Sequence, residues 1–175
     1  MPVCPRFRFR AERIDADFHS AFRSSPRADK TIRCLEQRKR SKPYCERKVL
    51  QYQREFAHAA IDAGADIVVG HGPHMILPLE LHAGRPVIYR GRNFSFLYEH
   101  GNKPHADWVG MFTHAEIVER SIRRLEISFV RRDEADRTIV RSVHDEPGER
   151  DELIASSAAN GAALTVEGDR LVLQL

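Results

Sequence analysis

The stretch Ala60–Phe96, AIDAGADIVVGHGPHMILPLELHAGRPVIYRGRNFSF, decides the fold of this chain of 175 residues. Within it, Asp66–Gly70 is a β-branched run between turn residues, which predicts a short buried strand. His71 follows at the carboxyl end of that strand, where the loops of open α/β sheets converge on ligands. Pro73 fixes one φ angle and removes a backbone donor, so the turn that carries His71 and His74 has little freedom. Two imidazoles on a stiff turn predict a site for a metal ion.

A helix is predicted immediately before this strand. Apolar residues recur at helical spacing from Val49 to Ala63, and Gly64 suits the position that ends a helix. His58 falls on the opposite, polar face of this helix, so we expect its side chain to be exposed to solvent.

A hairpin is predicted after the histidine turn. Leu77–His82 alternates apolar and polar residues, Ala83–Arg85 suits a tight turn, and Pro86–Tyr89 forms the return strand. His82 alternates onto the polar face, so we expect it at the surface as well.

The remainder of the chain is predicted to be rich in strands. The alternation around Arg123 and Arg124 is imperfect, which indicates a β-bulge there. Gly168 and Asp169 mark the turn of a closing hairpin. The elements expected are strands at 108–118, 122–130 and 138–143, a helix at 149–160, and strands at 164–166 and 171–173.

Composition places the chain among soluble globular domains. Hydrophobic residues make up 42% and charged residues 30% of the sequence, and no apolar run approaches the roughly 18–20 residues of a membrane span. The first residues are basic but lack the apolar region of a secretory signal. Cys4, Cys34 and Cys45 have no CxxC spacing, so we interpret them as spare thiols.

The net charge of +3 hides an asymmetry. Residues 1–50 hold 14 Lys and Arg against 6 Asp and Glu, a balance of +8, and residues 51–175 hold 14 against 19, a balance of −5. We divide the chain into a basic segment, 1–45, and a folded part, 46–175. We interpret the basic segment as a poorly ordered, solvated arm; a polyanion-binding arm is the alternative.

The motif GHGPH after an apolar strand, with Asn93 and Phe94 some twenty residues later, resembles a known family. ADIVVGHGPH followed by GRPVIYRGRNFSF is similar to the C-terminal signature of CapA-type poly-γ-glutamate (capsule) biosynthesis proteins, of the calcineurin-like metallophosphoesterase superfamily. The resemblance implies an αββα sandwich, of which this chain would be the C-terminal half with a β-rich end. Arg90, Gly91 and Arg92 depart from the family's Ser-Leu-Gly before its Asn-Phe.

The resemblance also implies a site. His71 and His74 would be metal ligands, and Gly70, Gly72, Pro73 and Asn93 would shape the site. The superfamily uses divalent ions such as Mn, Fe, Zn or Mg, which activate water and neutralise phosphoryl charge. The family's Asp, Asn and His ligands and its HWG motif have no counterpart in residues 1–50. We therefore expect a truncated chain that lacks a full metal site and is inactive as a hydrolase on its own, with a first segment foreign to the family.

Two functions remain open from the sequence. One is a role in poly-γ-glutamate or capsule biosynthesis, with poly-γ-glutamate or a phosphoester as ligand. The alternative is a non-catalytic interaction fragment that binds a partner, or a polyanion through the basic arm; nucleic acid is not the expected partner. An open sheet edge would favour self-association. The compartment is not predicted, although the resemblance implies relatives anchored at the membrane and facing outward.

Overall fold

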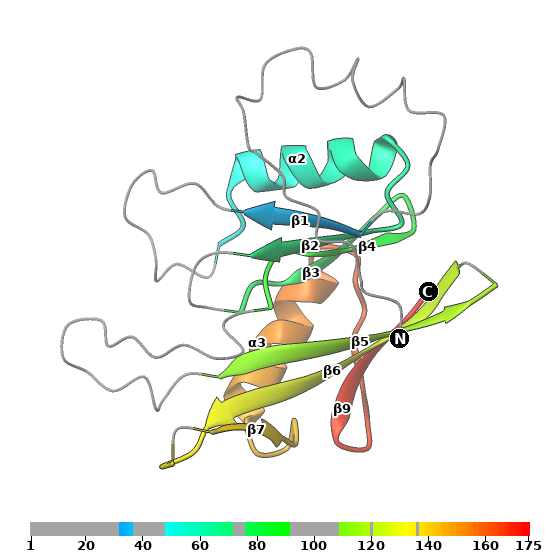
Figure 1. Ribbon diagram of the computed structural model, residues 1–175. Helices are drawn as coiled ribbons and strands as arrows, with labels where there is room; N and C mark the ends of the chain where they lie inside the picture. Colours follow the sequence, from blue (N-terminus) through cyan, green and yellow to red (C-terminus); the bar gives the residue numbers. More distant parts are fainter. Residues whose placement is uncertain (1–31, 37–47, 72–75, 92–108, 120, 136) are drawn as a thin grey trace, which may run out of the picture.

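The computed structural model describes residues 32–36, 48–71, 76–91, 109–119, 121–135 and 137–175, with the backbone alone for residues 32–36 and 71. Within these residues, helices combine with a mixed sheet and an antiparallel sheet, which confirms the predicted α/β class. Figure 1 shows helix α2 on one side of the mixed sheet and the antiparallel sheet on the other.

Helix α2 (Gln51–Asp62) lies where the apolar repeat predicted a helix. The Gln53 side chain accepts a hydrogen bond from the Leu50 N–H at 2.8 Å, which satisfies a donor at the start of the helix. Gly64 follows the helix with a φ of +102°, a conformation that favours glycine. The helix buries one face, which includes Ala57, Ala60 and Ile61.

The mixed sheet has the strand order β1-β2-β4-β3. Its strands are β1 (Ile32–Glu36), β2 (Ile67–His71), β3 (Leu79–His82) and β4 (Arg85–Ile88). β2 runs parallel to β1 and β4, whereas β3 pairs with β4 as the predicted antiparallel hairpin. Ala83 and Gly84 form its turn with φ of +51° and +73°, as a two-residue turn requires. β1 lies in the basic segment, where no strand was predicted.

The antiparallel sheet has the order β5-β6-β9-β8, and β7 also pairs with β6. Its strands are β5 (Gly110–Val118), β6 (Ser121–Arg132), β7 (Thr138–Arg141), β8 (Thr165–Glu167) and β9 (Arg170–Gln174). Glu116 pairs with Arg124 and Ile117 with Ile122, so Arg123 is the extra residue of a bulge. The bulge predicted at this point is confirmed.

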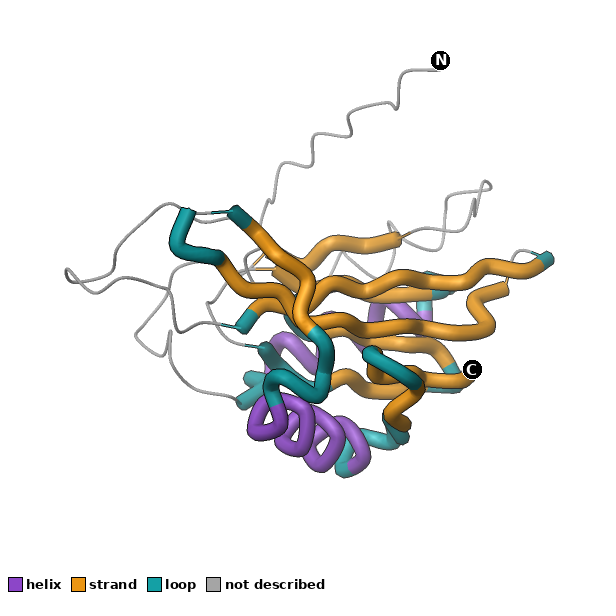
Figure 2. The backbone as a smooth tube through the Cα atoms, turned by 90° about the horizontal axis from the view of Figure 1, so that it is seen from below, coloured by secondary structure: helices purple, strands orange, loops and turns teal. Residues whose placement is uncertain are grey.

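Helix α3 (Pro147–Ala158) covers the outer edge of β3. The Leu79 N–H donates to Ser157 Oγ at 3.0 Å, and the Leu81 N–H donates to the Asn160 carbonyl at 3.2 Å. Two backbone N–H groups on the outer edge of β3, which would otherwise be free to pair with another strand, therefore have acceptors. Viewed from below, α3 lies along one flank of the strands (Figure 2).

Two apolar cores hold these layers together. Val68 and Val87 of the mixed sheet pack with Ala57 and Ala60 under α2. The opposite face of the same sheet contributes to a larger core with the antiparallel sheet and Leu153 of α3. β2 and β4 are therefore packed on both faces, as expected for parallel strands between two layers. The members of the larger core include Ile67, Leu79, Ile88, Leu125, Ile127, Phe129, Leu171 and Leu173.

Candidate functional site

The carboxyl end of β2 carries the first of the predicted metal ligands. His71 is the last residue of β2, and β2 lies between β1 and β4. Gly70 is buried there, and a Cβ at this position would lie 2.0 Å from the Tyr89 carbonyl oxygen. Glycine therefore permits the backbone of the segment after β4 to approach β2 immediately before His71.

A buried cation lies next in the chain to the contact between Gly70 and Tyr89. Val69 pairs with Ile88 at the end of β4, the Tyr89 carbonyl approaches Gly70, and Arg90 follows. Arg90 is 1% exposed. A guanidinium at that depth sets a fixed positive charge beside the strand end, since arginine stays protonated in proteins.

The other predicted site residues lie outside the described residues. These are Gly72, Pro73, His74 and Asn93, and the side chain of His71 is not described either. The convergence of the two imidazoles on one metal therefore stays a prediction. The structure does place Gly70 and the backbone of His71 at the strand end where the sequence predicted them.

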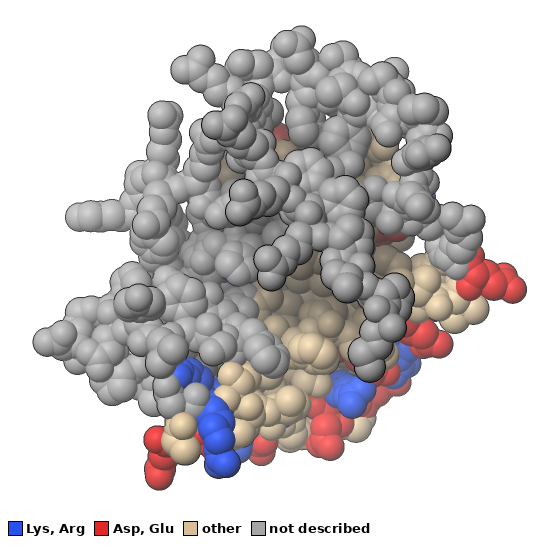
Figure 3. All heavy atoms as spheres, viewed as in Figure 1, with Lys and Arg blue, Asp and Glu red and all other residues tan. Residues whose placement is uncertain are grey.

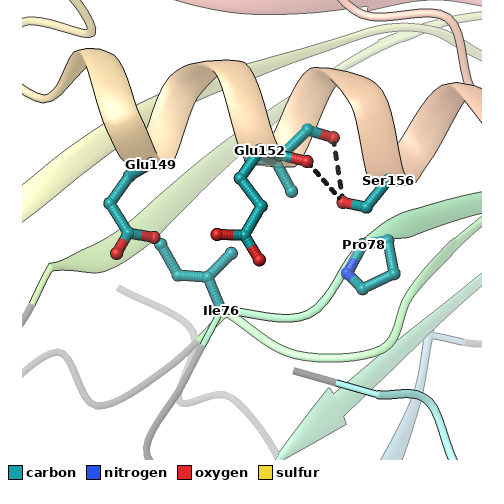
Figure 4. A pocket seen from close by; sticks show the side chains of 6 residues that line it. Ile76, Pro78, Glu149, Glu152 and Ser156 are labelled. Carbon is teal, nitrogen blue, oxygen red and sulfur yellow. Dashed lines mark hydrogen bonds between the residues drawn. The ribbon is translucent and has the colours of Figure 1, made fainter. Parts of the chain in front are cut away.

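A small pocket lies just downstream of the histidine turn. It is formed between α3 and the segment leading into β3, and Figure 4 shows Glu149 and Glu152 projecting from α3 toward Ile76. Ser156 Oγ donates to the Glu152 carbonyl at 2.7 Å. The lining residues are Ile76, Pro78, Glu149, Glu152, Leu153 and Ser156. The pocket therefore places two acidic side chains beside Ile76, which follows His74 by two residues.

A polar cluster that the sequence analysis did not predict is centred on Glu80 of β3. Glu80 is 6% exposed. Its Oε2 accepts hydrogen bonds from Arg54 at 2.6 Å and from the Tyr89 hydroxyl at 2.7 Å, and its Oε1 lies 2.6 Å from His58 Nε2. Arg54 also donates to Asn160 at 2.8 Å, which ties the cluster to the end of α3. The buried carboxylate is thus compensated by charge and hydrogen bonds.

His58 and His82 are part of the same cluster, so the expectation that both are simply solvent-exposed is wrong. Their side chains are 28% and 27% exposed. Their rings stack with centroids 3.8 Å apart and planes inclined by 7°. His82 Nε2 lies 2.8 Å from Asp62 Oδ1, so each imidazole faces a carboxylate. Both polar faces turn toward each other because α2 lies over the face of β3 that carries Glu80 and His82.

The contacts within the cluster shift the pKa values of Glu80 and Tyr89. Burial acts to raise the pKa of Glu80, but hydrogen bonds from Tyr89 and His58 and the charge of Arg54 outweigh it and hold that pKa below its usual value. Burial raises the pKa of Tyr89, and the hydrogen bond to the Glu80 carboxylate and its charge raise it further. Glu80 is therefore ionised and Tyr89 neutral at physiological pH.

A signal for this cluster was present in the sequence. Arg54, His58 and Asp62 recur every four residues, which forms one stripe on a helix, and Glu80 and His82 are two residues apart, on one face of a strand. Each pattern alone is typical of a solvated face. Only the packing of α2 across β3 brings them together.

The surface of the antiparallel sheet carries paired charges. Arg124 contacts both Glu126, at 3.0 Å, and Glu167, at 2.8 Å, and Arg170 contacts Glu126. On the face shown in Figure 3, acidic and basic side chains alternate along the lower rim. Exposed pairs of this kind contribute little to stability. Among the described residues, no helix has the length and apolarity needed to cross a membrane.

Comparison with known proteins confirms the resemblance over one segment. Residues 42–98 match the family model described as bacterial capsule synthesis protein PGA_cap. A segment of 44 residues is 50% identical to the PGA biosynthesis protein CapA of Bacillus subtilis and covers 25% of this chain and 12% of that protein. A segment of 34 residues is 50% identical to a probable polyglutamine synthesis accessory protein of Mycobacterium tuberculosis and covers 19% of this chain and 9% of that protein.

A third relative is uncharacterised. It is a protein of Sinorhizobium fredii, 42% identical over 45 residues, which cover 26% of this chain and 10% of that protein. The matched segments thus span 12% or less of each of these relatives. The family match encloses α2, β2, β3 and β4, the unit that carries both the strand-end histidine and the Glu80 cluster.

Proposed function

We propose that this chain takes part in the biosynthesis of a capsule polymer of the poly-γ-glutamate type. The observation that carries the proposal is the family match over residues 42–98, which coincides with one packed helix–strand–hairpin unit. The matched sequence is therefore a structural unit whose strand β2 ends at His71, and not a run scattered over unrelated elements.

The proposed centre lies at the carboxyl end of β2, where His71 and His74 would hold a divalent ion such as Mn, Fe, Zn or Mg. Among these ions, Fe and Zn are the ones that imidazole ligands suit best. The ion would neutralise charge on a phosphoryl or carboxylate group and lower the pKa of bound water. Arg90 is buried and follows Tyr89, whose carbonyl approaches Gly70, so it adds positive charge near the same strand end. Cations gathered there favour an anionic ligand, as a poly-γ-glutamate chain or a phosphoester would be.

Two histidines alone do not make a tight metal site. A catalytic zinc site of ordinary type has three protein ligands and an open position. We propose that His71 and His74 alone do not support phosphoester turnover by this chain. Asp62 and Asp66 do not complete the set, because they flank the amino end of β2 and contact His82 and Arg85.

The test is metal content. The untagged chain is dialysed to equilibrium against Mn²⁺ or Zn²⁺, and its bound metal is measured by mass spectrometry beside that of His71→Ala/His74→Ala and of a control, His114→Ala/His144→Ala. We expect the first pair of substitutions to lower the bound metal below that of the parent and the control pair, both exposed histidines, to leave it unchanged. Equal metal content in all three proteins would refute the proposed centre.

A non-catalytic interaction module is the second candidate. Several large apolar side chains of the antiparallel sheet are exposed: Phe112, Ile117, Val118, Val140 and Val166. Exposed apolar groups of this kind favour contact with a partner or a second copy. Light scattering after size-exclusion chromatography tests it, since a clean monomer that melts cooperatively at all concentrations would count against it.

A further inference from the structure

The Glu80 cluster has the composition and spacing of a chelating site. His58 and Asp62 are separated by one helical turn of α2, and Glu80 and His82 point to the same face of β3. Ligand atoms of His58, Glu80 and His82 all lie within 4.8 Å of one another, and they form the one group of three such residues among those that the structure describes.

We propose that α2 and β3 form a binding site for a divalent transition metal of the zinc class, held by His58, Glu80 and His82, with Asp62 or water as fourth ligand. Two imidazole nitrogens and one or two carboxylate oxygens are the donors that zinc accepts in a four-coordinate site. The site is separate from the proposed centre at His71.

Glu80 is held ready for this role. Its Oε2 is occupied by Arg54 and Tyr89, so its Oε1 is fixed on the side of His58. Such outer partners orient the ligands of metal sites and are worth roughly 10–100-fold in affinity. The positive charge of Arg54 works in the other direction, because it competes with a cation for the same carboxylate.

The present distances between the donor atoms are close to those around a coordinated zinc ion. Zinc bonds of about 2.0–2.2 Å place tetrahedral donors about 3.3–3.6 Å apart, and His58 Nε2 is now 2.6 Å from Glu80 Oε1. Nitrogen lone pairs lie in the ring planes, so the two stacked rings must open out to share an ion. His82 has the freedom to do this, because it ends β3 beside an exposed turn and its partner Asp62 is 61% exposed.

The two sites lie toward opposite ends of the mixed sheet. His82 pairs with Arg85 at the start of β4, and Ile88, three residues further along β4, pairs with Val69, which precedes His71 by two residues of β2. At about 3.3 Å per residue, this separates the two histidines by about 16 Å along the strands. The two sites therefore share no ligand, and a substitution of a ligand at one site removes no ligand of the other.

Isothermal titration calorimetry with ZnCl₂ tests the proposal on the untagged full-length chain, stripped with chelator. The titration is done in a background that removes the three cysteines and the strand-end histidines by Cys4→Ser, Cys34→Ser, Cys45→Ser, His71→Ala and His74→Ala. We expect one equivalent of zinc to bind and His82→Gln to weaken binding at least tenfold. The matched control is His114→Gln, since His114 lies 3.8 Å from Glu126 and, within the described part of the chain, belongs to no group of three potential ligands.

Absence of binding in this background, or equal binding by the His82→Gln and His114→Gln proteins, would overturn the proposal. His58→Gln gives an independent reading, because His58 comes from α2 and His82 from β3. We expect the His58→Gln protein to lose binding; a His58→Gln protein that melts as the parent and binds zinc as tightly would also overturn the proposal. Co²⁺ in place of zinc supplies an absorption spectrum that reports tetrahedral coordination directly.

Discussion

Gly70→Ala is the substitution whose effect follows most directly from the geometry. The added Cβ would lie 2.0 Å from the Tyr89 carbonyl oxygen, 2.7 Å from the Tyr89 carbonyl carbon and 3.3 Å from the Ile88 carbonyl oxygen. Ordinary contact begins at 3.4 Å. The obstacle is backbone and not the end of a flexible side chain, so β2 must move away from the end of β4.

The expected cost is near the upper end of the range for overpacking, about 3 kcal/mol. The lower backbone entropy of alanine in the unfolded chain returns about 0.4–1 kcal/mol. A net loss of roughly 2–3 kcal/mol lowers the melting temperature of a domain of this size by roughly 5–10 °C. Only two residue pairs are in register between β2 and β4, so a shift of β2 at Gly70 falls on a short stretch of paired backbone.

Thermal unfolding followed by circular dichroism measures this, with Gly148→Ala as control. Gly148 lies in the first turn of α3, and a Cβ there would meet no atom within 4 Å. The Gly148→Ala protein should melt at the temperature of the parent or slightly above, because alanine favours helix. If Gly70→Ala also melts within about 2 °C of the parent, the close approach of β2 and the Tyr89 carbonyl is wrong.

Three further outcomes are expected. Glu80→Gln should lower stability at pH 7 and flatten its dependence on pH in urea unfolding: a carboxyl whose pKa is lowered on folding stabilises the fold above its unfolded pKa of about 4.3, and that contribution is lost as the pH falls below it. Ser157→Ala should cost about 1–3 kcal/mol in urea unfolding, because the buried Leu79 N–H loses its acceptor; an unchanged midpoint would contradict this. Leu125→Ala should cost about 2–5 kcal/mol, since Leu125 is fully buried between the sheets.

The elements that the sequence predicted correctly are those with local signals. The 3.6-residue repeat identified α2, and Gly64 marked its end because the chain there needs positive φ. The bulge at Arg123 could be read from a break in alternation, and the closing hairpin from Gly168, which has a φ of +56°. In each case the physical requirement falls on a few consecutive residues.

The features that were missed depend on partners distant in sequence. β1 has no turn or repeat that marks it, and it is stabilised by parallel pairing with β2, Ile32 with Ile67, across 35 positions. Parallel pairs need such crossovers, so a short strand of this kind leaves no local pattern. The buried state of Arg90 was also missed, because arginine is normally exposed.

Tyr89 connects the two ends of the matched unit. Its hydroxyl donates to Glu80 on the face under α2, and its carbonyl oxygen lies against Gly70, next to His71. Arg54 lies over its ring, 5.9 Å from the centroid, so the same residue also packs against α2. The Glu80 cluster therefore fixes the position of the backbone on which the strand-end histidine rests. Burying a polar cluster costs desolvation free energy, and an apolar core would hold the layers together as well. The Glu80 cluster adds specificity instead, because the hydrogen bond from Tyr89 to Glu80 fixes one position for the Tyr89 ring and carbonyl, where apolar packing would allow several.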